Sequence, residues 1–302
     1  MRSLYPDVRV ADLCRVFGLS RQSYYRFIKR TIETKKQDIQ VIEMVKSIRA
    51  VHPRIGVRKI YSILGSEFSR QGMKIGRDKL FDLLSDNQML IRKRKRRVTT
   101  TNSYHHFHKY KNLIKDFVPY RSNQLWVSDI TYVKVEEGFS YLFLITDAYS
   151  RKIVGYKLSK SLETKNALES LQMALEMASD IKGLIHHSDR GIQYCSHNYV
   201  KLCQDYGLRI SMTEDGNPLD NSIAERVNGI LKDEYVHELD LVKHDQMVDQ
   251  IDTIIYKYNQ LRPHLSCDMK TPNQSHDLSG PLKRRWRNYY TVNEQKQNKI
   301  IQ

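Results

Sequence analysis

The stretch of residues 123–159, NQLWVSDITYVKVEEGFSYLFLITDAYSRKIVGYKLS, decides the fold of this chain. It contains three runs rich in β-branched and aromatic residues, at 125–135, 141–147 and 152–159, and polar turn residues separate the runs. Runs of this composition, bounded by turns, are typical of β-strands that pair with their neighbours. We therefore predict a three-strand antiparallel meander.

Helices and short strands alternate after the meander. A long amphipathic helix is predicted over 164–178, and the elements after it are strand 183–187, helix 198–206, strand 208–212 and helices 222–236 and 247–260. An antiparallel meander continued by parallel strands is the order of a ribonuclease-H-like mixed sheet. The predicted fold class is therefore α/β, with the sheet in a domain at 123–279.

The chain ahead of this domain is predicted to be all-α. Helical patterns at 8–17 and 21–30 are separated by Gly18-Leu19-Ser20, which indicates a helix-turn-helix module at 1–34. Apolar residues at helical spacing indicate a second module of this kind at 37–91. Generic helical hairpins share these patterns, so the sequence leaves that alternative open.

The positive charge of the chain is concentrated in its first part. The net charge is +16, and residues 1–120 hold 27 basic and 10 acidic residues, against 23 and 24 in residues 121–302. A basic part joined to a near-neutral part predicts that the basic part binds a polyanion such as DNA. A basic linker is expected at 92–122 and a basic polar tail at 280–302.

Ten basic residues of the first part are candidate phosphate contacts. Six of them form an unbroken run that suits an extended segment lying on phosphate, with a solvated linker or a localisation tag as the alternative. The candidates are Arg21, Arg26, Arg58, Lys59, Arg92, Lys93, Arg94, Lys95, Arg96 and Arg97.

Composition also bears on the compartment. The four cysteines form no CxxC pair, and no apolar run approaches the ~20 residues of a membrane span. The first ten residues lack the apolar core of a secretory signal. We expect a cytoplasmic protein with reduced thiols and no membrane partner.

Three acidic residues occupy positions where a carboxylate is costly or chemically useful. Asp129 lies inside the first predicted strand, Asp189 lies just past strand 183–187, and Glu225 lies on the helix that begins near Ser222. A buried carboxylate is unfavourable unless it is paired or bound to metal. Mg²⁺ or Mn²⁺ suits such oxygen ligands, and two ions ~3.5–4 Å apart can hold the attacking and leaving oxygens of a phosphodiester. We predict a catalytic site with two metal ions.

Other polar residues are expected to support this site. Asn228 and Lys232 share a helix face with Glu225 and are predicted to contact a phosphate backbone, although an exposed helix with ordinary charges is the alternative. His186 and His187 precede Asp189 and could touch substrate or metal, or support its ligands. Asp147, at the end of a predicted strand, is expected to be a structural acid.

These residues carry a resemblance to a known family. The pattern Asp129, Asp189 and Glu225, with 35 residues between the last two, resembles the DD(35)E signature of transposases similar to retroviral integrases. Lys232 matches the basic position of that family. The strings WVSDITYV, HSDRGIQY, DNSIAERVNGILKDE and YNQLRPHLSCDMKTP look like motifs of the bacterial insertion-sequence transposases encoded as a second reading frame, OrfB of the IS-three type. HPRIGVRKI, at 52–60, is also similar to that family.

The resemblance implies a transposase with an integrase catalytic core. Such an enzyme would bind double-stranded DNA, cleave a strand at each end of a mobile element, and use the freed 3′-OH to attack target DNA. It implies that Asp129 and Asp189 share one metal and that Glu225 holds the second. It also implies a homo-oligomer on DNA, with an upstream-frame partner or fusion. The zinc module of retroviral integrases is not expected, because no cysteine lies between Cys14 and Cys195.

Two other classes of function share part of this pattern. A ribonuclease H or a resolvase would have the same fold, but would lack the two helical modules and the 35-residue spacing. A DNA-binding regulator with an inactive core would not need the three carboxylates, which are intact here.

Overall fold

The chain folds into two compact units. The computed structural model describes most of the chain, namely residues 8–92, 107–214 and 221–283. We call residues 1–50 with 64–90 the helical unit, and residues 51–63 with 91–302 the sheet unit. Residues 51–63 therefore belong with the sheet, although they lie far upstream of it in the sequence.

One long helix dominates the helical unit. Helix α1 spans Val10–Val16, and α2 spans Arg21–Val51 as an uninterrupted helix of 31 residues. The expected break between helices at 21–30 and 39–48 is absent, because residues 31–38 contain neither glycine nor proline. The expected boundary between the first two modules, at 34–37, falls inside α2.

Helices α3 and α4 complete this unit. Helix α3 spans Val57–Arg70, so it begins in the sheet unit, and α4 spans Arg77–Asp86. Val41 and Val45 of α2 and Leu80 and Leu84 of α4 have no exposed surface. An ion pair of 3.7 Å between the Lys79 ammonium and the Asp38 carboxylate connects α4 to α2.

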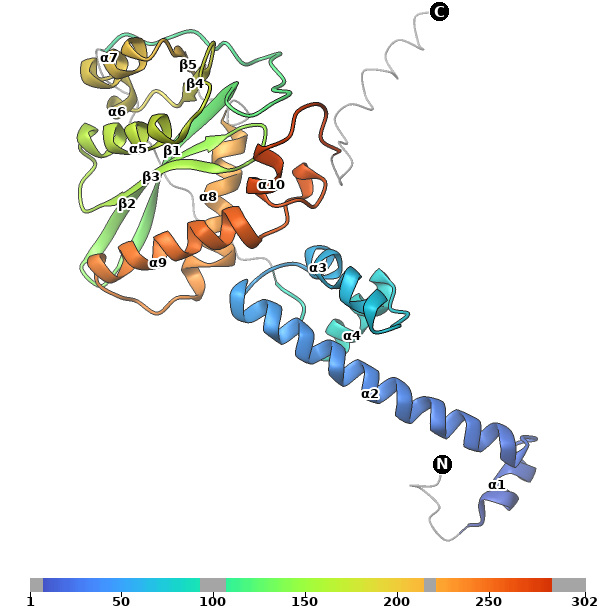
Figure 1. Cartoon of the computed structure of the whole chain (residues 1–302). Coiled ribbons are helices and arrows are strands. Elements are labelled where there is room, and N and C mark those ends of the chain that lie inside the picture. The colour runs from blue at the N-terminus through green and yellow to red at the C-terminus, as the bar shows by residue number, and fades with distance from the viewer. Residues whose placement is uncertain (1–7, 93–106, 215–220, 284–302) are drawn as a thin grey trace, which may run out of the picture. The chain divides into compact units, whose positions relative to one another are not determined.

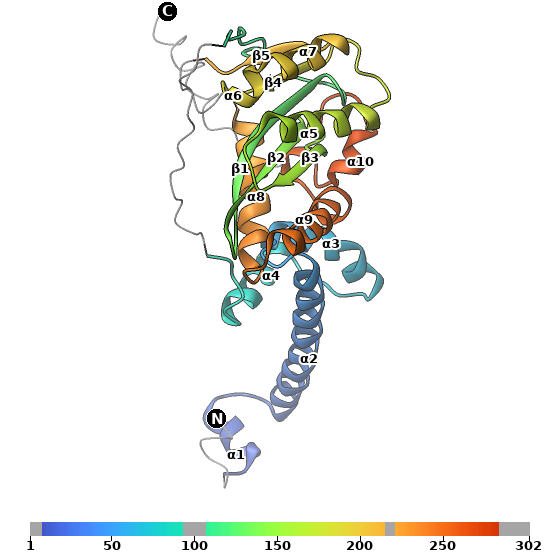
Figure 2. The same cartoon turned by 90° about the vertical axis from the view of Figure 1, so that its left-hand side faces the viewer.

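The sheet unit is built on five strands in the order β3-β2-β1-β4-β5, which can be followed in Figures 1 and 2. The antiparallel meander is confirmed: β1 pairs with β2 from Trp126↔Asp147 to Val135↔Gly138, and β2 pairs with β3. The two short strands β4 and β5 run parallel to β1. The strand bounds are Leu125–Val135, Gly138–Asp147, Ile153–Ser159, Ile185–Ser188 and Arg209–Met212.

Helices cover both faces of this sheet. Apolar side chains of α5 (Thr164–Met177), α6 (Ile192–Cys195) and α7 (His197–Asp205) form a core against one face. Those of α8 (Ser222–Glu234) and α9 (His244–Tyr256) form a second core against the other face. The remaining elements are η1 (Val236–Glu238), the π-helical turn η2 (Lys257–Leu261), η3 (Leu265–Cys267) and α10 (Pro272–His276). The predicted α/β class and mixed sheet are confirmed.

A glycine allows α5 to pack closely on β3. A Cβ atom at Gly155 would overlap the backbone oxygen of Ser170 and lie 2.9 Å from the Cβ of Ala174. The backbones of strand and helix therefore approach each other in a way that no larger residue permits at this position.

The second half of the expected linker 92–122 packs on the sheet unit. Phe107 and Tyr110 lie against the core under α5 and α7, and Ile114 and Phe117 lie against a cluster that includes Leu125. The backbone N–H of residue 113 donates to the Ser211 hydroxyl at 2.9 Å. The apolar residues between the lysines of this segment explain why it is not a free linker. Residues 93–106 lie outside the described residues.

Asp147 has the structural role that its position predicts. Its side chain is fully buried and accepts hydrogen bonds from the backbone N–H groups of Asn123 and Ser150 and from the Ser150 hydroxyl, at 2.7–2.8 Å.

In the parts of the chain that the structure describes, no helix is both long and apolar enough to cross a membrane.

Candidate active site

The two aspartates lie at the same level of the sheet. Strand β1 pairs in parallel with β4 up to Val127↔His187, so continuing this register by two residues puts Asp129 level with Asp189. Asp189 directly follows the last residue of β4, Ser188. Both carboxylates therefore lie at the carboxyl end of a parallel strand pair, where ligand sites collect in α/β sheets.

Helix α8 brings Glu225 to the same strand. The Asn221 side-chain amide donates to the backbone oxygen of Ser128 at 2.9 Å, and the Asn228 amide donates to Asp129 Oδ2 at 2.7 Å. Glu225 lies on α8 between these two residues and is exposed. Two amides thus hold the helix along β1 where the carboxylate of Asp129 emerges.

The negative charges of the other two carboxylates act on Asp129. Burial, and then the negative charges of Asp189 and Glu225, raise the pKa of Asp129 to about 7. Hydrogen bonds from Asn228 and from the backbone N–H of Ile130 oppose this rise. A bound cation would relieve the repulsion, which is the behaviour expected of a metal-binding carboxylate cluster.

The donor atoms suit a divalent metal, although the side chains are not closed around one point. Among the described residues, no group of three His, Cys, Asp or Glu side chains is close enough to hold one ion. Asp189 Oδ1 accepts the Gly191 N–H at 2.9 Å, which orients this carboxylate. Hard carboxylate oxygens from a strand, a strand end and a helix are nevertheless the ligands that Mg²⁺ and Mn²⁺ prefer.

The two histidines before Asp189 are parts of the sheet interior. His186 Nε2 lies 2.8 Å from the Ser128 hydroxyl and 3.0 Å from the Tyr199 hydroxyl, and burial lowers the pKa of His186 to about 3. His187 Nδ1 lies 2.9 Å from the Ser211 hydroxyl. The neutral His186 therefore connects β4 to α7 and to β1, where its partner Ser128 directly precedes Asp129.

Lys232 lies within electrostatic reach of Asp129. It is half-buried on α8, and burial lowers its pKa while the charge of Asp129 opposes this shift. The predicted sharing of a helix face by Glu225, Asn228 and Lys232 is compatible with these interactions.

The candidate phosphate contacts differ in accessibility. Arg21, Arg26, Arg58 and Arg92 are exposed. Lys59 is buried, and its ammonium donates to Glu234 at 2.9 Å. The predicted phosphate contact at Lys59 is therefore wrong, because this lysine forms a structural ion pair. The remaining candidates lie outside the described residues, namely Lys93, Arg94, Lys95, Arg96 and Arg97.

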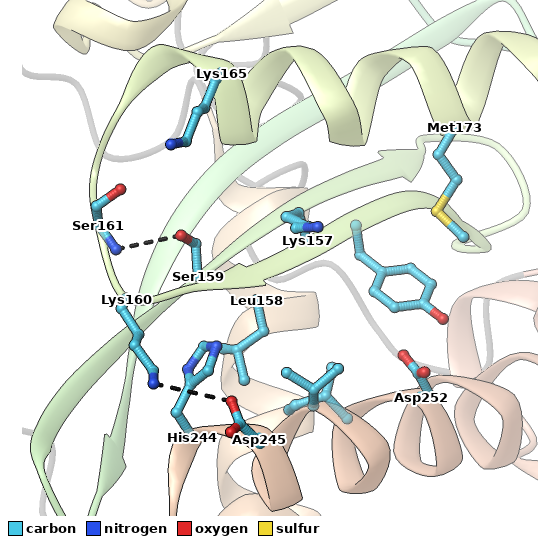
Figure 3. Close-up of a pocket in the computed structure, with 13 residues that line it drawn as sticks. Lys157, Leu158, Ser159, Lys160, Ser161, Lys165, Met173, His244, Asp245 and Asp252 are labelled. Atoms are coloured by element: carbon cyan, nitrogen blue, oxygen red, sulfur yellow. Dashed lines mark hydrogen bonds and ion pairs between the residues drawn. The ribbon is translucent and has the colours of Figure 1, made fainter.

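Figure 3 shows a cavity of about 680 Å³, and none of the three carboxylates lines it. It is lined by the end of β3, the start of α5 and one side of α9, and Figure 3 shows Lys160 directed at Asp245. Its lysines pair with acids at 2.6–3.9 Å: Lys157 with Glu169, Lys160 with Asp245 and Lys165 with Glu163. These pairs leave little unpaired charge for a polyanion.

The fold is that of an integrase core. Two family models, each described as an integrase core domain, match residues 119–218 and 206–272. An insertion element IS600 protein of 31 kDa from Shigella sonnei is 34% identical over 83% of this chain and 93% of its own length. The transposase for IS629 from the same organism is 31% identical, over 76% of this chain and 78% of its own. The chain belongs to the IS3 family of insertion-sequence transposases.

A further curated relative and two solved structures are also similar to this chain. Transposase InsF for IS3A of Escherichia coli is 29% identical over 89% of this chain and 94% of its own length. Among solved structures, the HTLV-2 integrase catalytic core in complex with magnesium is 20% identical, covers 53% of this chain and 99% of that chain, and has a TM-score of 0.42. A simian T-cell lymphotropic virus intasome is 19% identical, with 76% and 78% coverage and a TM-score of 0.47.

Sequence reasoning missed the contacts that hold the carboxylates in place. The bond from the Gly191 N–H to Asp189 and the bond from Asn221 to β1 depend on local geometry that residue spacing does not specify. Arg262 donates two hydrogen bonds to Glu234, and these residues lie in two of the quoted motifs. Their opposite charges were the sequence signal that could have predicted this ion pair.

Proposed function

We propose that this transposase binds the ends of its mobile element and catalyses metal-dependent strand cleavage and strand transfer, with Asp129, Asp189 and Glu225 as metal ligands. The observation that supports this proposal is geometric: strand register puts Asp129 level with Asp189, and the Asn221 and Asn228 amides hold the helix of Glu225 against β1. A ribonuclease-H-like nuclease and an inactive regulator remain the rival functions, and only the transposase requires all three carboxylates together with an end-binding part.

The residues around the carboxylates have separable tasks in this mechanism. Divalent metal, when bound, supplies Lewis-acid stabilisation of the charge that develops on the phosphodiester oxygens. Asn228 holds the Asp129 carboxylate in one orientation through its amide. Lys232, on the same helix, provides a positive point charge for a phosphate of the terminal strand. The nucleophile is water in cleavage and a DNA 3′-OH in transfer, so no covalent protein–DNA intermediate forms.

The test is a set of three isosteric substitutions in the full-length protein. Asp129→Asn, Asp189→Asn and Glu225→Gln should each abolish cleavage of labelled element-end DNA in Mg²⁺ and leave DNA binding intact, because each removes one metal ligand without removing basic residues. Substantial cleavage by any of them would exclude that residue as a ligand. Loss of DNA binding together with cleavage would indicate a folding defect instead.

We infer the partners of this protein from its charge distribution and from its family. Double-stranded DNA is the partner of the basic first part of the chain, and an oligomer on DNA, with an upstream-frame protein or fusion, is proposed from the family. An inactive regulator would bind the same DNA but release no cleaved strand, so the parent protein in the cleavage assay separates these two functions.

A further inference from the structure

The end of α8 carries a buried ion cluster that the catalytic proposal does not use. Glu234 is the last residue of α8, nine residues after Glu225. Its carboxylate accepts from Arg262 Nε and Nη2, both at 2.7 Å, and from Lys59 Nζ at 2.9 Å. These three residues come from segments that are far apart in the sequence, and Arg262 is only 1% exposed.

Neighbouring contacts involve the same upstream segment, residues 51–63, which we call the arm. His52 Nδ1 lies 2.7 Å from the Tyr235 hydroxyl, and the two rings stack edge to face. Arg54 pairs with Glu238 at 3.5 Å and donates to the backbone oxygen of Arg92. The arm thus contacts three positions at and just after the end of α8, so within the sheet unit it packs against this end of the helix.

The cluster contains two positive charges, on Arg262 and Lys59, and one negative charge, on Glu234. Although burial alone would raise the pKa of Glu234, Arg262 and Lys59 lower it to about 2. Burial and the Arg262 charge lower the pKa of Lys59 to about 8. One carboxylate therefore serves two cations. Loss of Glu234 would leave two buried cations together, whereas loss of Lys59 would leave the bidentate Glu234–Arg262 pair intact.

From these contacts we infer that Glu234 is a positioning residue, which couples the arm to the active site by fixing the end of the helix that carries Glu225 and Lys232. The inference rests on the proposed function. Asn221 and Asn228 hold α8 against β1, and the Glu234 cluster holds its last turn, two residues after Lys232. Small displacements of groups that align a reacting phosphate have large effects on rate, so the attachment of this last turn bears on catalysis.

Lys59→Met in the full-length protein is the informative change, since it removes the contact of the arm with Glu234 and spares the Glu234–Arg262 pair. Hydrogen–deuterium exchange without DNA or metal should show amides of 228–238 exchanging at least ~5-fold faster, because the fixed end of α8 loosens, with α5 unchanged. Cleavage of element-end DNA should show kcat lowered about tenfold at unchanged KM. Lys59→Arg should restore both, because it keeps the charge next to Glu234.

Lys165→Met is the matched control, because it removes a surface lysine paired with Glu163 and should change neither measurement. Unchanged exchange in α8 of Lys59→Met would overturn the inference, as would faster exchange with unchanged kcat. If Lys59→Met does not fold, Glu234→Asp, which shortens the carboxylate by one methylene, takes its place with the same expectations. The exchange measurement does not depend on catalysis. An inactive parent protein would therefore contradict the proposed function, while hydrogen–deuterium exchange would still decide whether Lys59 fixes the end of α8.

Discussion

Lys232 lies within electrostatic reach of Asp129, and we propose that it also contacts a DNA phosphate. We expect Lys232→Ala to weaken crosslinking and cleavage of element-end DNA more than it disturbs metal binding, because the ammonium is a point charge for phosphate. Lys232→Arg should be partly tolerated, since the charge is kept. Crosslinking and cleavage are compared with the parent protein at matched Mg²⁺. Equal values for Lys232→Ala would mean that the DNA does not follow this face of α8.

Asp147 has a structural role, so its replacement should change the stability of the fold. The carboxylate accepts two hydrogen bonds from Ser150, in the turn between β2 and β3, and one from the backbone N–H of Asn123, ahead of β1, so Asp147→Ala leaves buried donors unsatisfied. We expect a loss of about 3 kcal/mol in the free energy of unfolding, measured in urea. Asp205→Ala, at the exposed end of α7, is the control and should change it by no more than about 0.5 kcal/mol. Similar values for both would contradict the structural role of Asp147.

The contact between α5 and β3 depends on a single missing side chain. Gly155→Ala should lower the free energy of unfolding by about 1–3 kcal/mol, because the methyl group would meet the Ser170 carbonyl and Ala174. Gly65→Ala in α3 is the matched control: its Cβ meets nothing within 4 Å, and helix propensity should stabilise the protein by about 0.5–1 kcal/mol. Chemical denaturation of both variants decides the matter, and a neutral Gly155→Ala would mean that α5 shifts without cost.

The elements that the sequence predicts well are those with a strong local pattern. The meander and α5 have clear periodicity and turn residues, and the structure contains them at almost the predicted bounds. Helix α2 was divided in prediction because two apolar stretches were treated separately, although no helix-breaking residue lies between them. Packing of 107–117 was not predictable, because its apolar residues find their partners only in the folded sheet unit.

The same distinction holds for the candidate site. Asp129, Asp189 and Glu225 stand out by residue type and spacing, and register and helix contacts bring them to one strand. Lys59 was misinterpreted because a basic residue in a basic segment looks like a phosphate contact. Its partner Glu234 lies 175 positions away in the chain, and no local pattern reveals such an ion pair.

The asymmetric charge of the chain can be tested on the whole molecule. The whole excess of positive charge lies in the first 120 residues, and Arg21 and Arg26 are exposed on α2. Binding to phosphate releases counterions, so the logarithm of DNA affinity should fall linearly with the logarithm of salt concentration. An arginine that contacts phosphate contributes to this slope, while a buried lysine does not.

Substitution of exposed and of buried basic residues should therefore distinguish side chains that contact DNA from side chains that stabilise the fold. In the full-length protein, replacing Arg21 and Arg26 together by Gln should reduce the steepness of the salt dependence by about 2, measured by gel-shift titration over a series of salt concentrations. Lys59→Met also removes a positive charge, yet it should leave that slope unchanged, because the ammonium is already bound to Glu234. A shallower slope for Lys59→Met with no change for the arginine pair would show that the DNA contacts the arm instead of the start of α2.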